Sequence, residues 1–185
     1  MSSSWTGVWW VAYIRKINLE TGIISTLGGG KVGSNNYFYG SGTSLVISSE
    51  GTHYVLDKRN HRIHRWTNQQ VVAGDFDYDN NYYHFCGTGV QGHTGDGGVA
   101  ALAQIGYPSS GAIYNNELYF LSHLDSGPQK YIRKINLISE PFPNISTVAG
   151  GAQGYGGDGG PLSGARFGPD ASLVIASEGT LYVLE

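Results

Sequence analysis

The sequence predicts an all-β protein, a β-propeller with three blades' worth of four-stranded antiparallel sheet per chain. Three observations predict this fold. Near-identical segments recur along the chain, short strand-like runs alternate with tight turns, and no window shows the apolar periodicity of a helix. Units of four short antiparallel strands are typical of propeller blades. A β-sandwich would also have short alternating strands, but it would not have near-identical units in a fixed order.

The repeats are long enough to define structural units. The seven residues 13–19 recur letter for letter as 131–137, and 44–52 recur as 172–180 with one change. Two shorter segments also have counterparts: 24–28 is similar to 145–150, and Gly-Asp-Gly-Gly at 95–98 recurs as 157–160. Self-similarity of this kind indicates an array of supersecondary units.

Aligning the repeats sorts the expected strands into four kinds. They are rich in Val, Ile, Tyr and Trp and are bounded by Gly, Asn, Asp, Ser or Pro. The first strands are expected at 43–48, 110–114 and 171–176, the second at 53–57, 118–122 and 181–185, the third at 13–18, 61–66 and 131–136, and the fourth at 23–27, 70–74 and 145–149.

The order of these strands predicts an incomplete ring. The chain reads as a single propeller half, 1–185: third and fourth strands at 8–27, complete blades at about 43–74 and 110–149, and first and second strands at 171–185. Three blades cannot close a ring, because propellers typically have about 4–8. Two chains could close one if each C-terminal pair completed the other's N-terminal pair. We therefore expect a homodimer that forms a six-bladed ring; the alternative is a fragment of a longer product.

Composition narrows the classes of function. The net charge of −3 offers no basic field for nucleic acid or an anionic membrane. A single cysteine, Cys86, excludes an internal disulfide framework and has no obvious activating partner. The N-terminal residues lack a basic region and a long apolar stretch. We expect no signal peptide, no membrane partner, no cofactor and, by default, a cytoplasmic location.

Residues 57–63, Asp-Lys-Arg-Asn-His-Arg-Ile, resemble the signature of the NHL-repeat family, which marks the passage from second to third strand. Residues 145–150 and 154–162 look like that family's fourth strand and following loop, and the resemblance covers nearly the whole chain from Tyr13. It implies a propeller, commonly six-bladed, that binds proteins, ligands or nucleic acids; a few relatives are enzymes. The loop 28–42 lacks Gly-Asp-Gly-Gly and 122–130 lacks Asn-His-Arg, so identical sites in each blade are not expected.

The ion-binding motifs are weak. His61 and His64 are three apart, so on a strand they would point to opposite faces and could not share a metal. Each Gly-Asp-Gly-Gly loop offers one carboxylate, Asp96 or Asp158, whereas calcium takes about 6–8 oxygens. Glycines in such loops permit positive φ, and Asp caps turns. We expect no metal site, although an ion-binding role for these loops stays open.

A long acidic and aromatic segment is the most suggestive region. From Gly74 to Gly95 is 21 residues, whereas the equivalent interval from Gly150 to Gly157 is 7, which indicates a 14-residue insertion after a fourth strand. Tyr beside Asp or Asn suits sugar or peptide contacts. The candidate ligand-binding residues of this segment are Tyr78, Asp79, Tyr82, Tyr83 and His84. A segment that covers a blade edge or fills the dimer interface is the alternative.

Propeller topology predicts where a ligand would bind. Loops from second to third strand and from fourth to first strand emerge on one side. We therefore expect the insertion to share a rim with His61 and with the further candidates Asp96, His123, Asp125 and Asp158.

The function expected from the sequence is non-enzymatic: a scaffold that assembles with itself and binds a protein, peptide or glycan on its loop rim. One alternative is a hydrolase or lyase with a metal in the central channel, but the expected inner strands carry no His. The other is an excised or engineered half-propeller with no evolved activity.

Overall fold

A computed structural model of the chain describes residues 13–29, 42–69, 84–125, 127, 129–139, 141–168 and 171–185. These residues form an all-β fold with two four-stranded antiparallel sheets, which confirms the predicted class and sheet type. The first sheet contains β3 (Ser44–Ile47), β4 (His53–Asp57), β5 (Arg62–Trp66) and β6 (His84–Cys86). The second contains β7 (Ser109–Tyr114), β8 (Glu117–His123), β9 (Lys130–Asn136) and β10 (Ile145–Gly150).

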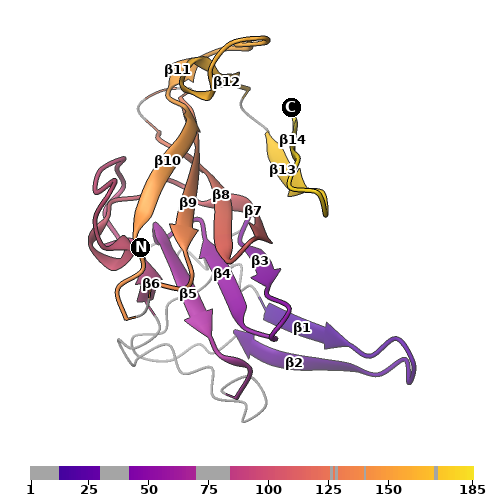
Figure 1. Ribbon diagram of the computed structural model, residues 1–185. Coiled ribbons are helices and arrows are strands. Elements are labelled where there is room, and N and C mark those ends of the chain that lie inside the picture. The colour runs from indigo at the N-terminus through magenta and orange to yellow at the C-terminus, as the bar shows by residue number, and fades with distance from the viewer. Residues whose placement is uncertain are drawn as a thin grey trace, which may run out of the picture.

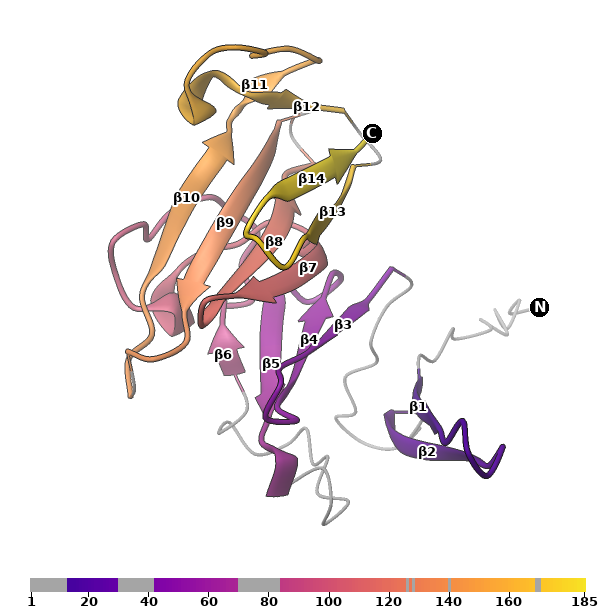
Figure 2. The ribbon, with the colours of Figure 1, turned by 45° about the vertical axis from the view of Figure 1, so that its right-hand side comes forward.

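Two antiparallel strand pairs accompany the sheets. The N-terminal pair joins β1 (Tyr13–Ile17) to β2 (Ile24–Gly29), and the C-terminal pair joins β13 (Ser172–Ile175) to β14 (Leu181–Leu184). The two pairs lie apart in both views (Figures 1 and 2). Strand β7 contacts both β3 and β13, so the first strands of successive units lie in series. The described sheets do not close into a ring within one chain.

Short elements lie in the loops between the units. Strands β11 (Ala152–Gln153) and β12 (Arg166–Phe167) pair in parallel, and two 3-10 turns are η2 (Ala100–Leu102) and η3 (Leu162–Gly164). The β7–β8 hairpin turns through Asn115 and Asn116, whose φ angles are 47° and 58°. Asn tolerates this left-handed conformation, which two-residue hairpin turns require.

The fourth strand of the first sheet differs in position from the sequence prediction. Most of the expected strand at 70–74 lies outside the described residues, and β6 is the strand that pairs with β5. Gly87 directly follows β6 and Gly150 is the last residue of β10, and their φ angles are 92° and 97°. A Cβ at either glycine would meet a carbonyl oxygen at 2.3 Å or 2.1 Å, so both positions require glycine.

This position changes the interpretation of the insertion. Gly87 to Gly95 spans eight residues, close to the seven from Gly150 to Gly157, so the loop after β6 has nearly the ordinary length. The additional chain connects β5 to β6. That connection leaves and rejoins the sheet at the end opposite the β4–β5 and β6–β7 connections, because neighbouring strands are antiparallel. The prediction that the insertion belongs to the loop after the fourth strand was wrong.

The N-terminal pair has the register of the second sheet's outer half. Arg15 pairs with Thr26 as Arg133 pairs with Thr147, and a bulge follows at the same place in both pairs. Ile17 pairs with Ile24 as Ile135 pairs with Ile145. The repeated sequence therefore gives the same local structure twice.

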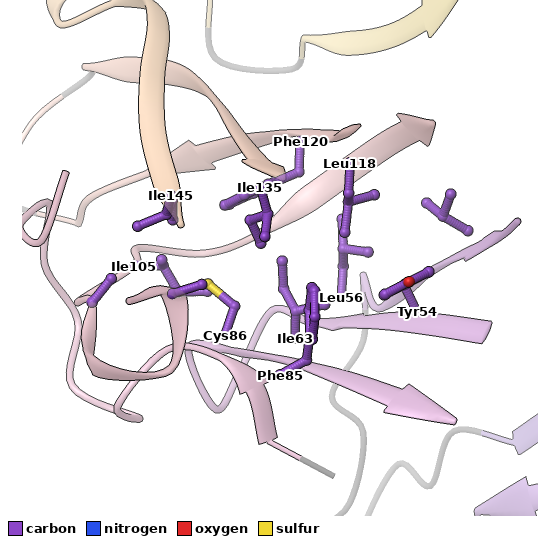
Figure 3. Close-up of a cluster of buried hydrophobic side chains, with 13 residues drawn as sticks. Tyr54, Leu56, Ile63, Phe85, Cys86, Ile105, Leu118, Phe120, Ile135 and Ile145 are labelled. Carbon is purple, nitrogen blue, oxygen red and sulfur yellow. The ribbon is translucent and has the colours of Figure 1, made fainter. Parts of the chain in front are cut away.

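The main core lies between the two four-stranded sheets (Figure 3). The first sheet contributes Leu56, Ile63 and Cys86, and Ile105 comes from the loop that joins the sheets. From the second sheet, the core receives Leu118, Phe120, Ile135 and Ile145. All of these side chains are at most 1 % exposed.

A second, smaller core lies between the second sheet and the C-terminal pair. Leu121, Ile132 and Ala149 face it at the positions that Leu56, Ile63 and Cys86 occupy in the first sheet. Leu181 and Val183 of β14 pack against this core at the positions of Leu118 and Phe120. Among the described residues, none fills the places in this core that Ile135 and Ile145 fill in the main core.

Candidate functional site

Four side chains from both sheets meet at one rim. His61 lies in the turn between β4 and β5, Tyr107 lies in the loop before β7, and His123 and Asp125 lie at the end of β8 and just beyond it. The Tyr107 ring centroid is 4.7 Å from that of His61 and 4.9 Å from that of His123. The Tyr107 hydroxyl donates a hydrogen bond to the Asp125 carboxylate. We call these four residues the rim cluster.

Two members of the rim cluster, His123 and Tyr107, are uncharged at pH 7. Burial lowers the pKa of His123, and the charges of Lys130 and Lys58 lower it further. His123 is therefore neutral at pH 7. The hydrogen bond to Asp125 raises the pKa of Tyr107, which stays a phenol. The cluster thus offers aromatic faces beside hydrogen-bonding groups, a combination suited to sugars or polar peptides.

The structure brings two of the predicted site residues, His123 and Asp125, into one cluster and places the other described ones elsewhere. His84 lies within β6, where its Nε2 is 3.3 Å from Arg62 Nη1. Burial, helped by the charges of Arg62 and His64, lowers the pKa of His84 to about 4. The candidates Tyr78, Asp79, Tyr82 and Tyr83 lie outside the described residues.

Asp96 fastens its loop to the second sheet. The fully buried Arg133 on β9 places Nη2 2.5 Å from Asp96 Oδ1. The Thr147 backbone N–H donates to Asp96 Oδ2 over 3.0 Å. Arg133 also donates to the carbonyl oxygens of Gln104 and Thr94, at 2.9 Å and 3.1 Å. We call these contacts of Asp96 with Arg133 and Thr147 the loop lock. Both carboxylate oxygens of Asp96 take part in it, and they hold the loop against the second sheet.

The contacts of the loop lock lower the pKa of Asp96. Partial burial would raise the pKa of Asp96, but hydrogen bonds from Thr147 and Arg133, together with the Arg133 charge, lower it below its ordinary value. Asp96 is therefore an anion at pH 7, held by a cation and a backbone donor.

A stacked pair completes the lock. The His93 ring lies parallel to the Tyr131 ring, with centroids 3.4 Å apart and an angle of 17° between the planes. His93 Nε2 is 3.1 Å from Thr147 Oγ1. Burial and the neighbouring Arg133 lower the pKa of His93 to about 4, so the ring is neutral at pH 7.

Asp158 occupies the same place in the second Gly-Asp-Gly-Gly loop but lacks the lock. Its side chain is exposed, and no described residue forms an ion pair or hydrogen bond with it. Tyr155, at the position of His93, is 67 % exposed. Within the described residues, this loop therefore has no counterpart of the Arg133 contact that holds the Asp96 loop.

The described residues contain neither a candidate metal site nor a reactive cysteine. Across the described ranges, no three His, Cys, Asp or Glu side chains lie close enough to hold a metal ion. Burial raises the pKa of the Cys86 thiol to about 12, so it is not a nucleophile at neutral pH. The described part of the chain contains no helix that is both long and apolar enough to span a membrane.

Comparison with known proteins gives no family assignment. The chain matches no protein-family model, and no curated protein is a significant match.

Sequence reasoning missed Tyr107, Arg133 and His93. The sequence did contain a signal for Arg133. This residue lies on the third strand of the sheet that follows a Gly-Asp-Gly-Gly loop. The sheet that follows a loop without this motif has His64 at the equivalent position. His64 Nε2 lies 3.5 Å from the buried Asp57 carboxylate instead. Nothing in the sequence indicated that Tyr107 would join two histidines from different sheets.

Proposed function

We propose that this chain is an NHL-type half-propeller whose function is to assemble with a second copy into a closed, six-bladed binding scaffold. The observation that carries the proposal is the pair of half-sheets. The pair β13–β14 corresponds to the first two strands of the second sheet, β7 and β8, and the pair β1–β2 corresponds to its last two, β9 and β10. The β13–β14 pair of one chain and the β1–β2 pair of another would therefore make one complete four-stranded blade.

The exposed apolar residues support assembly. Ile17, Ile24 and Leu184 are 58 %, 52 % and 74 % exposed, whereas their equivalents Ile135, Ile145 and Leu121 are at most 1 % exposed. Exposed strand edges with apolar side chains favour pairing with another chain. Two copies would satisfy both edges in a two-fold arrangement, which leaves no edge for further growth.

Light scattering after size exclusion, over a range of protein concentrations, tests this proposal. The expected result is one species of about twice the 19.9 kDa chain mass. A particle of the chain mass at all concentrations would contradict the assembly. A continuous increase in mass with concentration would show open growth instead of a closed ring.

The rim cluster is our proposed ligand-binding face, for a glycan or a polar peptide. Tyr107 supplies a ring face, and Asp125 and His123 supply hydrogen-bonding groups beside it. Arrays of neutral oligosaccharides and of peptides, probed with labelled protein, test this role. Binding by the wild type that is lost in Tyr107→Ala, but kept in the surface variant Glu178→Ala, is expected. Equal signals from both variants would contradict it.

A further inference from the structure

We propose that Asp158 of one copy and Arg15 of another form an ion pair that specifies how two chains assemble. This inference rests on the proposed function, because it assigns the residues that would hold the composite blade, made of β13–β14 from one chain and β1–β2 from the other. The intact second sheet provides the template for every contact.

The loop that carries Asp158 already has the conformation of its locked counterpart. A bridge joins Gly156 to Arg166, as another joins Thr94 to Gln104. The turn bond from the Gly160 N–H to the Gly157 carbonyl measures 3.0 Å, and its counterpart from Gly98 to Gly95 measures 3.1 Å. A 3-10 turn follows in both loops. Asp158 therefore stands where Asp96 stands relative to its own loop.

Residue Arg15 is the matching cation. It lies on β1 within a segment identical to 131–137, at the position of Arg133, and its register partner Thr26 corresponds to Thr147. In the described residues Arg15 is exposed and has no acidic partner. The third strand of the first sheet, β5, has His64 at the equivalent position. β1 therefore has the residue that a locked Asp requires.

Neighbouring groups agree with this pairing. In the intact sheet the Gly97 N–H donates to the Ile145 carbonyl, and the Ile145 N–H donates to the Gly98 carbonyl, at 2.8 Å and 3.1 Å. The equivalent backbone groups are those of Gly159, Gly160 and Ile24. Among the described residues, neither the Gly159 N–H nor the Gly160 carbonyl has a backbone partner, although the Gly160 N–H makes the turn bond to Gly157. A second copy would provide both bonds in the same register.

Side chains around the ion pair also have counterparts. His93 stacks on Tyr131, and the residues at those positions are Tyr155 and Tyr13, which are 67 % and 54 % exposed. Ile17 and Ile24 would fill the places in the smaller core that Ile135 and Ile145 fill in the main core. One match is absent: Lys134 pairs with Glu117, but Thr180 stands at the position of Glu117, so Lys16 gains no acid.

Charge reversal and mixing test the inference. A ring of Arg15→Asp chains would place Asp beside Asp158 twice, and a ring of Asp158→Arg chains would place Arg beside Arg15 twice. We expect each variant alone to dimerise about tenfold or more weakly than the wild type. A mixed pair would contain one natural and one reversed ion pair. Native mass spectrometry of a mixture of the two variants should therefore show mainly the mixed dimer.

The controls separate this inference from the assembly itself. Lys16→Asp mixed with Asp158→Arg should show no such preference, because adjacent strand residues point to opposite faces. The neutral variants Arg15→Gln and Asp158→Asn should weaken dimerisation less, and circular dichroism checks that each chain folds. A wild type that dimerises while the two charge-reversed variants form no excess of mixed dimer would overturn the ion pair and leave the ring. A monomeric wild type would overturn both.

Discussion

The second sheet and the two strand pairs contain the same sequence elements in opposite environments. Ile135 on β9 is completely buried, whereas Ile17 on β1, in an identical seven-residue segment, is 58 % exposed. Arg133 is fully buried with an ion-pair partner, whereas Arg15 is exposed and has no such partner in the described part of the chain. The local register is the same in both places. The comparison teaches that the segment determines its own strand structure, but that neighbouring strands determine what it buries.

The largest expected difference concerns the isoleucines. Ile135→Ala should reduce the free energy of unfolding by about 2–5 kcal/mol at any protein concentration, because it leaves a cavity in the main core. Ile17→Ala should change that free energy by less than about 0.5 kcal/mol in dilute monomeric protein, where the side chain is exposed. At protein concentrations that favour the dimer, Ile17→Ala should reduce the free energy of unfolding by more than this. Urea unfolding at low and high concentration measures both, and an equal effect of Ile17→Ala at the two concentrations would contradict the comparison.

Substitutions of Asp96 and Asp158 should also differ in their effect on the free energy of unfolding, but by less than the two isoleucine substitutions do. Asp96→Asn weakens the charged hydrogen bonds of the loop lock and should cost about 1–2 kcal/mol, less than for a fully buried pair because Asp96 is partly exposed. Asp158→Asn should leave the unfolding of the monomer unchanged within about 0.5 kcal/mol. Equal losses for the two variants, measured by urea unfolding in dilute protein, would mean that the two loops are not distinguished by their partners.

A smaller effect should be visible in the pH dependence of stability. The pKa of His93 is about 4 in the folded chain and about 6.5 when unfolded. The unfolded state therefore binds more protons between these values, and stability is lost as the pH falls from 6.5 to 4. His93→Tyr, which copies Tyr155 of the other loop, should reduce this loss without abolishing it, because His84 and His123 also have lowered pKa values. Urea midpoints at pH 7, 5.5 and 4.5 measure the slope; an unchanged slope would contradict the assignment of His93.

Much of the fold followed from the sequence because the repeats carry it. Strand kinds could be assigned by aligning 13–19 with 131–137 and 44–52 with 172–180, and the structure has strands in all four segments. The fourth strand of the first sheet could not be placed in this way. Its sequence, His84-Phe85-Cys86-Gly87, shares with Thr147-Val148-Ala149-Gly150 only its final glycine, and the positive φ at that glycine is a property of the folded backbone.

The candidate site was less accessible to sequence reasoning. His123 and Asp125 were expected on one rim with His61, and they do meet there, because strand topology fixes which loops lie together. Asp96 was expected on that rim too, but its carboxylate is engaged by Arg133 from a segment 37 residues later in the chain. Such contacts depend on side-chain packing between a loop and a distant strand, which spacing alone does not reveal.

The most direct test of the central claim is a disulfide between β1 and β14 of different chains. Tyr119 is the register partner of Lys134, and the equivalent residues are Tyr182 and Lys16. In a Lys16→Cys/Tyr182→Cys variant, opposed strand residues lie within disulfide reach. Our account predicts that mild oxidation gives a covalent dimer of about twice 19.9 kDa, while Lys16→Cys/Val183→Cys, slipped by one residue, does not. The account would be contradicted by chains that stay uncross-linked or by a series of cross-linked species larger than a dimer. Equal cross-linking of the Lys16→Cys/Val183→Cys variant would also contradict it.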